Sequence, residues 1–267
     1  MRARDPLGRA IHVLRWMAEQ PAPFVGVREI ATALGMQPST VSRLLASLAE
    51  ERLVRRDPRT SGFAPGLELM RLGVLASQKL DVRAAARVHM RTLADQCNES
   101  VFLGLFDPSR QELFRVETVS SNRPLRYVVE MDQWTKIYLG ASGLGVLAFL
   151  PDAQRELGIR LADAAAGPDR PWLRRAEFEP MLDRIRAQGY AITFGMRIPD
   201  AVGVSAPVFA EGGRVLGSVI LTVPKVRIGE HDQPQLARLI TETAAAITHD
   251  IGGSRPDYLH QPYQLQQ

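Results

Sequence analysis

The polar residues between positions 37 and 47 are the side chains whose types point most directly to a chemistry. They are Gln37, Ser39, Thr40, Ser42, Arg43 and Ser47, and apolar residues at helical spacing stand between them. All six can donate hydrogen bonds and none is acidic, whereas a solvated helix face usually carries glutamate and lysine. Short donors with an arginine suit the base edges and phosphates of DNA. The pattern predicts a helix that lies in a DNA groove; the alternative is a helical hairpin with an ordinary solvated face.

Two short amphipathic helices joined by a tight turn would position these residues. Apolar residues recur at i, i+3, i+4 and i+7 in both, as Val27, Ile30, Ala31 and Leu34 and then as Val41, Leu44, Leu45 and Leu48. Gly35 suits the end of the first helix and Pro38 the start of the second. A preceding helix over residues 7–20, stopped by Pro21, would cover their apolar faces. Together these elements predict a helix-turn-helix.

An arginine-rich hairpin is expected directly after the second helix. Residues 53–56 predict a short strand, residues 57–62 are turn-forming, and Phe63 begins a return strand. Arg55, Arg56 and Arg59 would then lie along phosphates as a wing, with Arg28 as a further contact; the alternative is a plain soluble turn. Residues 1–64 hold ten arginines against six acids, whereas the rest of the chain is neutral. This charge distribution is typical of a polyanion-binding head on a neutral body.

The second half of the chain predicts an α+β domain. Residues 65–80 are expected to form a linker helix, and a further helix should follow the N-cap candidate Asp81. Six strands are expected in an antiparallel sheet, at residues 101–106, 113–119, 125–130, 190–194, 202–209 and 215–223. Helices are expected at 143–150, within 152–189, and in a closing segment that ends near residue 251. The predicted divisions are therefore a head at 5–64, the linker, a domain at 81–252 and a disordered tail at 253–267.

Two sets of motifs in this order resemble the IclR family of bacterial regulators. The first set is RAIHVLRWMA, VREIATALGMQPSTVSRLLASLAEERLVRRD and FAPGLELMRLG; the second is GASGLGVLAFLP and the segment 186–227. The resemblance covers about residues 5–250. It implies a winged helix-turn-helix, a linker helix and a GAF-like effector domain with an antiparallel sheet. It further implies a ligand-responsive regulator that binds a palindromic operator of double-stranded DNA as a homodimer or a dimer of dimers.

The resemblance also implies where an effector would bind. Carried over by position, the effector-binding residues are Gly143, Leu144, Thr193, Gly203, Ile220 and Thr222, and Ser205 would add a hydroxyl. Several family members carry more polar residues where this chain has Met196, Gly203 and Ile220. A less polar site favours a larger and more apolar ligand, so we expect an aromatic or otherwise hydrophobic carboxylate rather than a small keto acid. The alternative is that these are ordinary core residues.

Enzymatic sites find little support in the sequence. The five histidines are scattered without metal-ligand spacing, and the segment 140–145 fails the G-x-S-x-G pattern because Leu144 replaces its last glycine. Gly143, Gly145 and Ala148 fit only a loose dinucleotide fingerprint, and no βαβ pattern surrounds them. No catalytic residue, metal or cofactor is therefore expected. The alternatives that remain are a ligand-independent DNA-binding protein and a small-molecule enzyme fused to a helix-turn-helix.

Cellular location is expected to be the cytoplasm. A single cysteine, Cys97, allows no disulfide within the chain, which favours a reducing compartment. The most apolar run, residues 144–150, is too short to span a bilayer. No membrane contact is expected.

Overall fold

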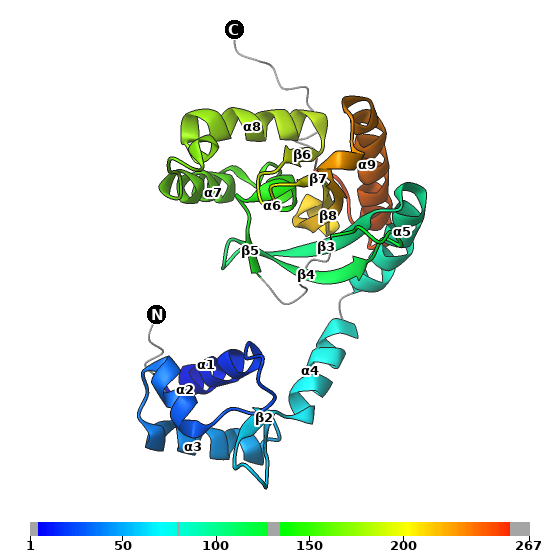
Figure 1. Ribbon diagram of the computed structural model, residues 1–267. Coiled ribbons are helices and arrows are strands. Elements are labelled where there is room, and N and C mark those ends of the chain that lie inside the picture. Colours follow the sequence, from blue (N-terminus) through cyan, green and yellow to red (C-terminus); the bar gives the residue numbers. More distant parts are fainter. Residues whose placement is uncertain (1–4, 79–80, 128–133, 257–267) are drawn as a thin grey trace. The chain divides into compact units, whose positions relative to one another are not determined.

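The computed structural model describes residues 5–78, 81–127 and 134–256. The chain divides into two compact units, Met1–Leu80 and Asp81–Gln267, and each is described by itself. The first unit consists of α1 (Pro6–Ala18), α2 (Val27–Leu34), α3 (Pro38–Glu50), the hairpin strands β1 (Val54–Arg56) and β2 (Phe63–Pro65), and α4 (Leu67–Gln78), as Figure 1 shows. This order confirms the predicted winged helix-turn-helix followed by a helix.

Local chemistry explains the helix ends of the first unit. The side chain of Asp5 accepts a hydrogen bond of 2.8 Å from the backbone N–H of Gly8, which caps α1. Gly35 ends α2 in the left-handed conformation at φ 62°, which a glycine adopts without steric cost. Pro38 occupies the first turn of α3. The apolar stripes of α1, α2 and α3 meet in one core that includes the fully buried Val13 and Leu45.

The second unit is built on one six-stranded antiparallel sheet in the order β5-β4-β3-β8-β7-β6. The strands are β3 (Ser100–Asp107), β4 (Glu112–Val119), β5 (Trp134–Lys136), β6 (Ala191–Phe194), β7 (Ala201–Phe209) and β8 (Val215–Pro224). The helices are α5 (Asp81–Cys97), α6 (Gly140–Leu147), α7 (Asp152–Ala164), α8 (Arg175–Gln188) and α9 (Gln233–Asp250). This architecture confirms the predicted α+β class.

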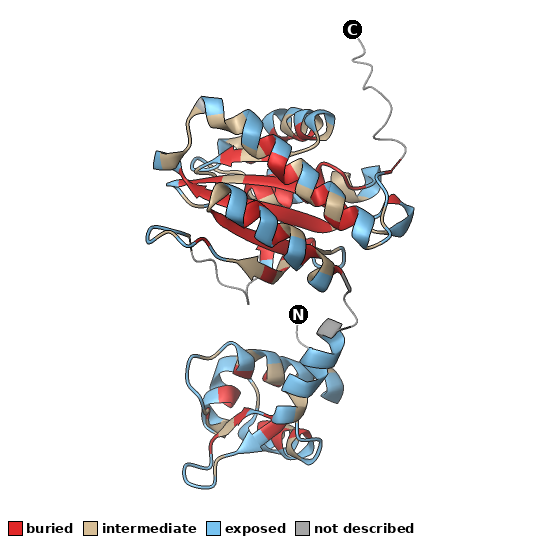
Figure 2. Ribbon diagram, turned by 90° about the vertical axis from the view of Figure 1, so that its right-hand side faces the viewer, coloured by how far each residue is buried: buried red, intermediate tan, exposed pale blue. Residues whose placement is uncertain are grey.

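The two faces of this sheet are covered by different helices. α5 and α9 lie on one face, over a core that includes Val101, Val204 and Leu221. α6 lies on the other face, and α7 and α8 pack on α6. Figure 2 shows the buried residues, in red, along the strands between these layers. A cavity at the end of α6 can therefore be lined by a helix and a sheet together.

A bulge between β3 and β4 changes which way the β4 side chains face. Leu103 pairs with Glu117 and Gly104 pairs with Arg115, so Val116 is the extra residue. In a regular strand Arg115 and Glu117 would share a face. With the bulge, Glu117 lies on the α5 side, where Arg83 donates to it over 3.0 Å, and Arg115 lies on the α6 side with Leu113.

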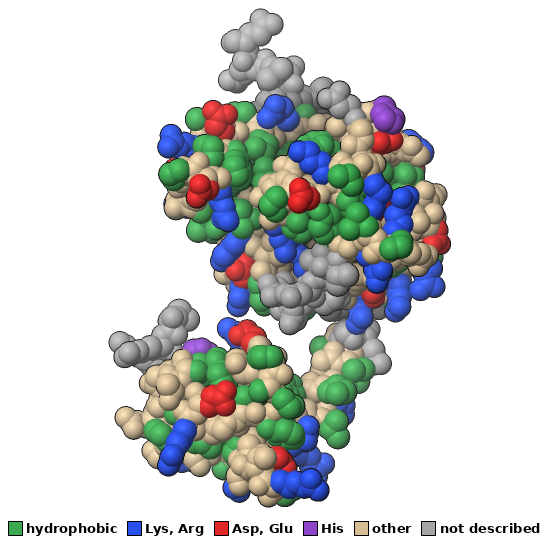
Figure 3. All heavy atoms as spheres, viewed as in Figure 1, with side chains coloured by type: hydrophobic (Ala, Val, Ile, Leu, Met, Phe, Trp, Pro, Cys, Tyr) green, Lys and Arg blue, Asp and Glu red, His purple; other side chains and the backbone are tan. Residues whose placement is uncertain are grey.

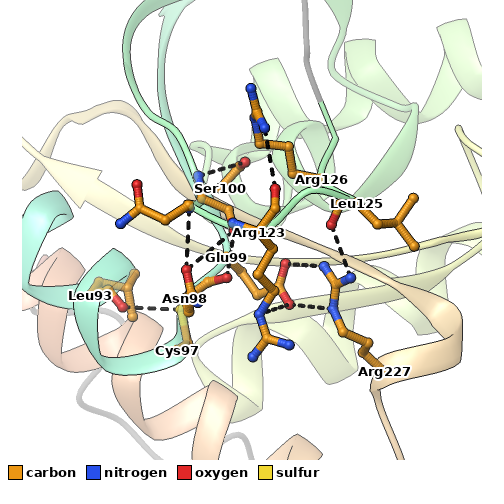
Figure 4. A network of polar contacts seen from close by, with 11 residues as sticks. Leu93, Cys97, Asn98, Glu99, Ser100, Arg123, Leu125, Arg126 and Arg227 are labelled. Atoms are coloured by element: carbon orange, nitrogen blue, oxygen red, sulfur yellow. Dashed lines mark hydrogen bonds and ion pairs between the residues drawn. The ribbon is translucent and has the colours of Figure 1, made fainter.

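A buried carboxylate ties three segments together at one end of the sheet. Glu99 is 4% exposed and accepts two hydrogen bonds of 2.7 Å from the guanidinium of Arg227. Arg227 also donates to the carbonyl oxygen of Leu125 over 3.0 Å, and Arg123 lies 3.8 Å from Glu99 (Figure 4). The network compensates a charge that would otherwise be costly to bury.

Two of the sequence predictions were wrong in this unit. The strand expected at 125–130 is absent over residues 125–127, because the carbonyl of Leu125 is used by Arg227 rather than by a ladder; residues 128–130 lie outside the described residues. The edge strand is β5 instead. The tail expected to be disordered from 253 is packed over its first residues: Gly253 donates to the carbonyl of Thr248 over 2.8 Å and Pro256 is buried. Residues 257–267 lie outside the described residues.

Candidate nucleic-acid surface and ligand cavity

The outward face of α3 carries the polar residues singled out from the sequence. Five of them are exposed and Thr40 is half-buried; the exposed residues are Gln37, Ser39, Ser42, Arg43 and Ser47. Val41, Leu45 and Leu48 anchor the opposite face of the helix in the core. Among the described residues no carboxylate pairs with Arg43. The helix therefore presents a ridge of hydrogen-bond donors without a neutralising partner.

The hairpin that follows α3 holds its arginines over aromatic rings. The guanidinium of Arg55 lies 4.7 Å from the centre of the Phe24 ring, and that of Arg56 lies 5.9 Å from the Phe63 ring. Arg56 also donates to the hydroxyl of Ser61 over 3.0 Å. Such stacking orients a guanidinium while leaving its edges available to an anion.

The carboxylate of Asp57 accepts hydrogen bonds from other residues of the hairpin turn. The hydroxyl of Thr60 donates to Asp57 over 2.6 Å and the backbone N–H of Arg59 donates to it over 3.1 Å. These bonds, led by that of Thr60, lower the pKa of Asp57. Arg59 and, on α2, Arg28 are exposed. Figure 3 shows arginine side chains, in blue, around the hairpin at the lower end of this unit.

A cavity of about 50 Å³ lies between α6 and the sheet of the second unit. β3, β4, β6, β7 and β8 contribute to its lining, together with the first turn of α6 and the loop after β6. The lining residues are Phe102, Arg115, Gly140, Ala141, Ser142, Thr193, Met196, Arg197, Ile198, Ala201, Gly203, Ile220 and Thr222. The lining combines apolar side chains, three hydroxyls and two arginines, and none of these residues is acidic.

The first turn of α6 is fixed against the sheet by side-chain hydrogen bonds. The hydroxyl of Ser205 donates to the carbonyl of Ala141 over 2.6 Å, and that of Ser218 donates to the carbonyl of Ser142 over 2.9 Å. Gly145 allows this approach, since a Cβ there would lie 2.1 Å from the oxygen of Ser205. The N–H groups of a first helical turn have no partner within the helix and favour an anion. α6 thus brings its positive end rigidly to the cavity.

Four of the seven predicted effector residues line this cavity, namely Thr193, Gly203, Ile220 and Thr222. The other three do not. Leu144 is fully buried in the core below, and a Cβ on Gly143 would lie 2.2 Å from the carbonyl oxygen of Ile137, which makes that glycine a packing residue. Ser205 is also fully buried, and its hydroxyl is engaged by Ala141.

The two arginines of the cavity were missed by the sequence analysis. Arg197 is exposed overall and lies over the start of α6. Its Cβ is 3.2 Å from the position that a Cβ on Gly140 would occupy. Partial burial of its guanidinium lowers the pKa of Arg197. Arg115 is 8% exposed, with its guanidinium 5.8 Å from the Phe102 ring. An arginine within the apolar strand sequence LFRVETV was the visible signal.

Neither a metal-ligand cluster nor a membrane-spanning helix is found in the described parts of the chain. No group of three or more His, Cys, Asp and Glu side chains gathers as metal ligands within residues 5–78, 81–127 and 134–256. Over the same residues, no helix combines the length and hydropathy needed to cross a bilayer.

Known proteins resemble the chain over nearly its whole length. Residues 6–58 match the model of the IclR helix-turn-helix domain, and residues 74–249 match that of the bacterial transcriptional regulator IclR C-terminal domain. The glycerol operon regulatory protein of Streptomyces griseus is 29% identical over 251 residues, which cover 93% of this chain and 97% of that protein.

Solved structures share the fold. An IclR transcriptional regulator from Alicyclobacillus acidocaldarius superposes with a TM-score of 0.79 at 23% identity, covering 92% of this chain and 98% of that one. An IclR homologue from Microbacterium hydrocarbonoxydans, solved in complex with 4-hydroxybenzoate, superposes with a TM-score of 0.78 at 19% identity. That match covers 94% of this chain and 100% of the other.

Proposed function

The chain belongs to the IclR family of bacterial transcriptional regulators, and we propose that it binds a palindromic operator and releases or engages it in response to a small organic carboxylate. It is a regulator rather than an enzyme, as are its named relatives. In this proposal residues 5–64 contact DNA in the cytoplasm, residues 65–80 link the two parts, and residues 81–252 bind the effector.

The exposed donor face of α3 is the observation that carries the DNA-binding half of the proposal. A recognition helix places the residues near its N-terminus against base edges in the major groove. Gln37, Ser39, Ser42 and Arg43 occupy this place, and Arg43 can make a bidentate contact with guanine. Arg55, Arg56 and Arg59 would hold phosphates from the hairpin.

Exposed apolar surface on α4 supports the assembly of two copies of the chain into a dimer. Leu67 is 76% exposed, Met70 65% and Leu72 45%, so this helix leaves large side chains in water within its own unit. Figure 3 shows hydrophobic side chains, in green, at the surface of α4. A second copy of α4 would cover them, and two recognition helices would then read a palindrome. A dimer of dimers, formed through the effector domains, is the larger assembly we propose.

The effector proposal rests on the cavity at the start of α6. The helix end and Arg197 would receive a carboxylate, while Phe102, Met196 and Ile220 would contact an apolar body. The cavity of about 50 Å³ is smaller than the ~150 Å³ that accommodates benzene. An aromatic effector would therefore displace the loop that carries Met196 and Arg197. A related structure, that of the Microbacterium homologue, contains 4-hydroxybenzoate.

Operator selection followed by effector titration tests both halves. Random-sequence DNA selected on the full chain should yield a palindromic site, and fluorescence anisotropy with that site should respond to an aromatic or hydrophobic carboxylate. Thermal shifts over the same acids report binding independently, because a ligand of the native state raises the midpoint. Tight pyruvate or glyoxylate binding without aromatic-acid binding would contradict the effector class. Operator binding that no acid changes would favour a ligand-independent regulator.

A further inference from the structure

We propose that Arg227 is a positioning residue that couples the effector cavity to α5, the helix with which the second unit begins. The inference rests on the proposed effector function and concerns how a signal leaves the cavity. Its basis is the ion pair between Arg227 and Glu99, which connects the segment attached to the cavity loop with the C-terminal end of α5. A ligand response must join these two segments, because the linker to the DNA-binding unit precedes α5.

The loop between β6 and β7, which carries two of the cavity residues, is attached to the end of β8. The backbone N–H of Gly195 donates to the carbonyl of Ala201 over 2.9 Å, and this hydrogen bond closes the loop at its base. The carbonyl of Asp200 accepts a hydrogen bond of 2.8 Å from the backbone N–H of Lys225. A ligand that displaces this loop would therefore also act on residues 225–227.

Arg227 uses its three guanidinium nitrogens to hold two other segments. Nε and Nη2 donate to the two carboxylate oxygens of Glu99 over 2.7 Å each, and Nη1 donates to the carbonyl of Leu125 over 3.0 Å. Figure 4 shows these hydrogen bonds around the guanidinium. Because the bidentate contact fixes both planar groups, a shift of Arg227 must move Glu99 or break the ion pair. Glu99 is 4% exposed, so breaking the pair would leave a buried charge without compensation.

The residues around Glu99 also fix the end of α5, which closes at Cys97 two positions earlier. Asn98, between them, has φ 50°, a left-handed conformation that asparagine adopts more readily than most side chains. The hydroxyl of Ser121 donates to the carbonyl of Asn98 over 2.7 Å, and the backbone N–H of Asn122 donates to its side-chain oxygen over 3.2 Å. A movement of Glu99 would therefore reach the C-terminal end of α5 directly.

Fluorescence anisotropy of the full chain on the selected operator measures the coupling, with saturating benzoate as an aromatic probe and hexanoate as an aliphatic one. We expect a change of at least about fivefold in the operator Kd of the wild-type protein. The double variant Glu99→Gln/Arg227→Gln should bind the acid with nearly wild-type affinity and retain less than about a twofold change. Both charges are removed together because a single change would leave the other charge buried and unpaired. Arg227→Lys, which keeps an ion pair with one donor group, should retain part of the coupling.

The matched control is the ion pair between α7 and α8, removed as Arg155→Gln/Asp183→Asn. The Arg155 side chain is 12% exposed, and neither residue lines the cavity. This variant should lower the midpoint of thermal unfolding as the first one does and keep the wild-type coupling. A purely structural role for Arg227 predicts instead that both double variants lose stability and that both keep the coupling.

A second measurement needs no effector, because coupling between two sites is reciprocal. Operator binding by the wild-type protein should change the rates of backbone hydrogen exchange at residues 195–200. The Glu99→Gln/Arg227→Gln variant should lose this change while still binding the operator. The control variant should show the same change as the wild-type protein.

The outcomes distinguish this inference from the function on which it rests. Wild-type coupling in the Glu99→Gln/Arg227→Gln variant overturns the role of Arg227, and equal loss in the control variant overturns its specificity. If neither acid binds, but the operator changes exchange at residues 195–200, the carboxylate effector is overturned and the coupling stands. If the wild-type protein shows neither the change in operator Kd nor the change in exchange, the coupling itself is overturned.

Discussion

The two units of this protein place their candidate functional side chains in opposite environments. In the first unit, the polar residues of α3 and the hairpin arginines stand on the surface, and the core beneath them is apolar. In the second unit, the cavity residues lie between a helix and a sheet, where Thr193 is 7% and Arg115 8% exposed. A surface site can change without disturbing packing, whereas each change in the cavity also changes the core. Mutations should therefore separate function from stability in the first unit and couple them in the second.

The largest effect is expected in the core under the surface site. Leu45→Ala should destabilise the first unit by about 2–5 kcal/mol, because Leu45 is fully buried and its loss leaves a void. Chemical denaturation, with hydrogen exchange of the first unit as the readout, would measure this loss of unfolding free energy. Leu7→Ala, at a position 70% exposed, is the control and should stay within about 0.5 kcal/mol. Equal losses in the two variants would show that the core under α3 is not formed as described.

Removal of an exposed donor should affect binding alone. Arg43→Ala should weaken operator binding by about 1–3 kcal/mol if it contacts a base pair, with the midpoint of thermal unfolding unchanged. Anisotropy titrations on the selected operator and on single-base variants would measure affinity and specificity. Arg160→Ala, on the second unit, is the control. Wild-type affinity in Arg43→Ala would exclude Arg43 as a contact.

Removal of two hydroxyls of the second unit should have different effects, one on the unfolding free energy and the other on ligand affinity. Ser205→Ala leaves the carbonyl of Ala141 without its donor and should cost about 1–3 kcal/mol of unfolding free energy. Thr193→Val should instead lower carboxylate affinity by about 0.5–1.5 kcal/mol. Denaturant unfolding and calorimetry on both variants would measure the two quantities. An effect of Ser205→Ala on affinity alone would restore Ser205 as a ligand contact.

The smallest effect concerns pH. The ring of His89 on α5 lies 2.7 Å from the carboxylate of Asp250 on α9, and this contact, followed by that of His249, lowers the pKa of Asp250. A carboxyl with a lowered native pKa stabilises the protein above its unfolded pKa of about 3.9 and loses that contribution as pH falls through the native value. Asp250→Asn should therefore flatten the decline of the unfolding midpoint at acidic pH. Asp95→Asn, at an exposed position, should leave the decline unchanged.

The surface site was predictable because its signal is local. Helical spacing, Gly35 and Pro38 define α2 and α3, and the absence of acids on one face of α3 is visible in the chain itself. The predicted polar residues of α3 are exposed or half-buried as expected. The strand order of the second unit, in contrast, depends on contacts between distant segments.

The cavity was only partly predictable for the same reason. The resemblance to the IclR family, carried over by position, gave Thr193, Gly203, Ile220 and Thr222, which line the cavity. Gly143 and Ser205 occupy the same region but serve the packing of α6, a distinction that depends on distances rather than residue type. Arg115 could not be assigned to a face from alternation, because the bulge at Val116 changes the alternation.

That bulge also bears on how such a regulator could change its ligand. The extra residue in β4, Val116, places Arg115 and Glu117 on opposite faces of the sheet, although they are two positions apart in the sequence. Addition of one residue to β3 opposite Val116 would restore regular pairing, and Arg115 and Glu117 would then share one face of the sheet. A single-codon insertion could thus alter the charge of the site without any substitution among its lining residues. The length of a strand, as well as the identity of its side chains, would then determine which ligand the protein binds.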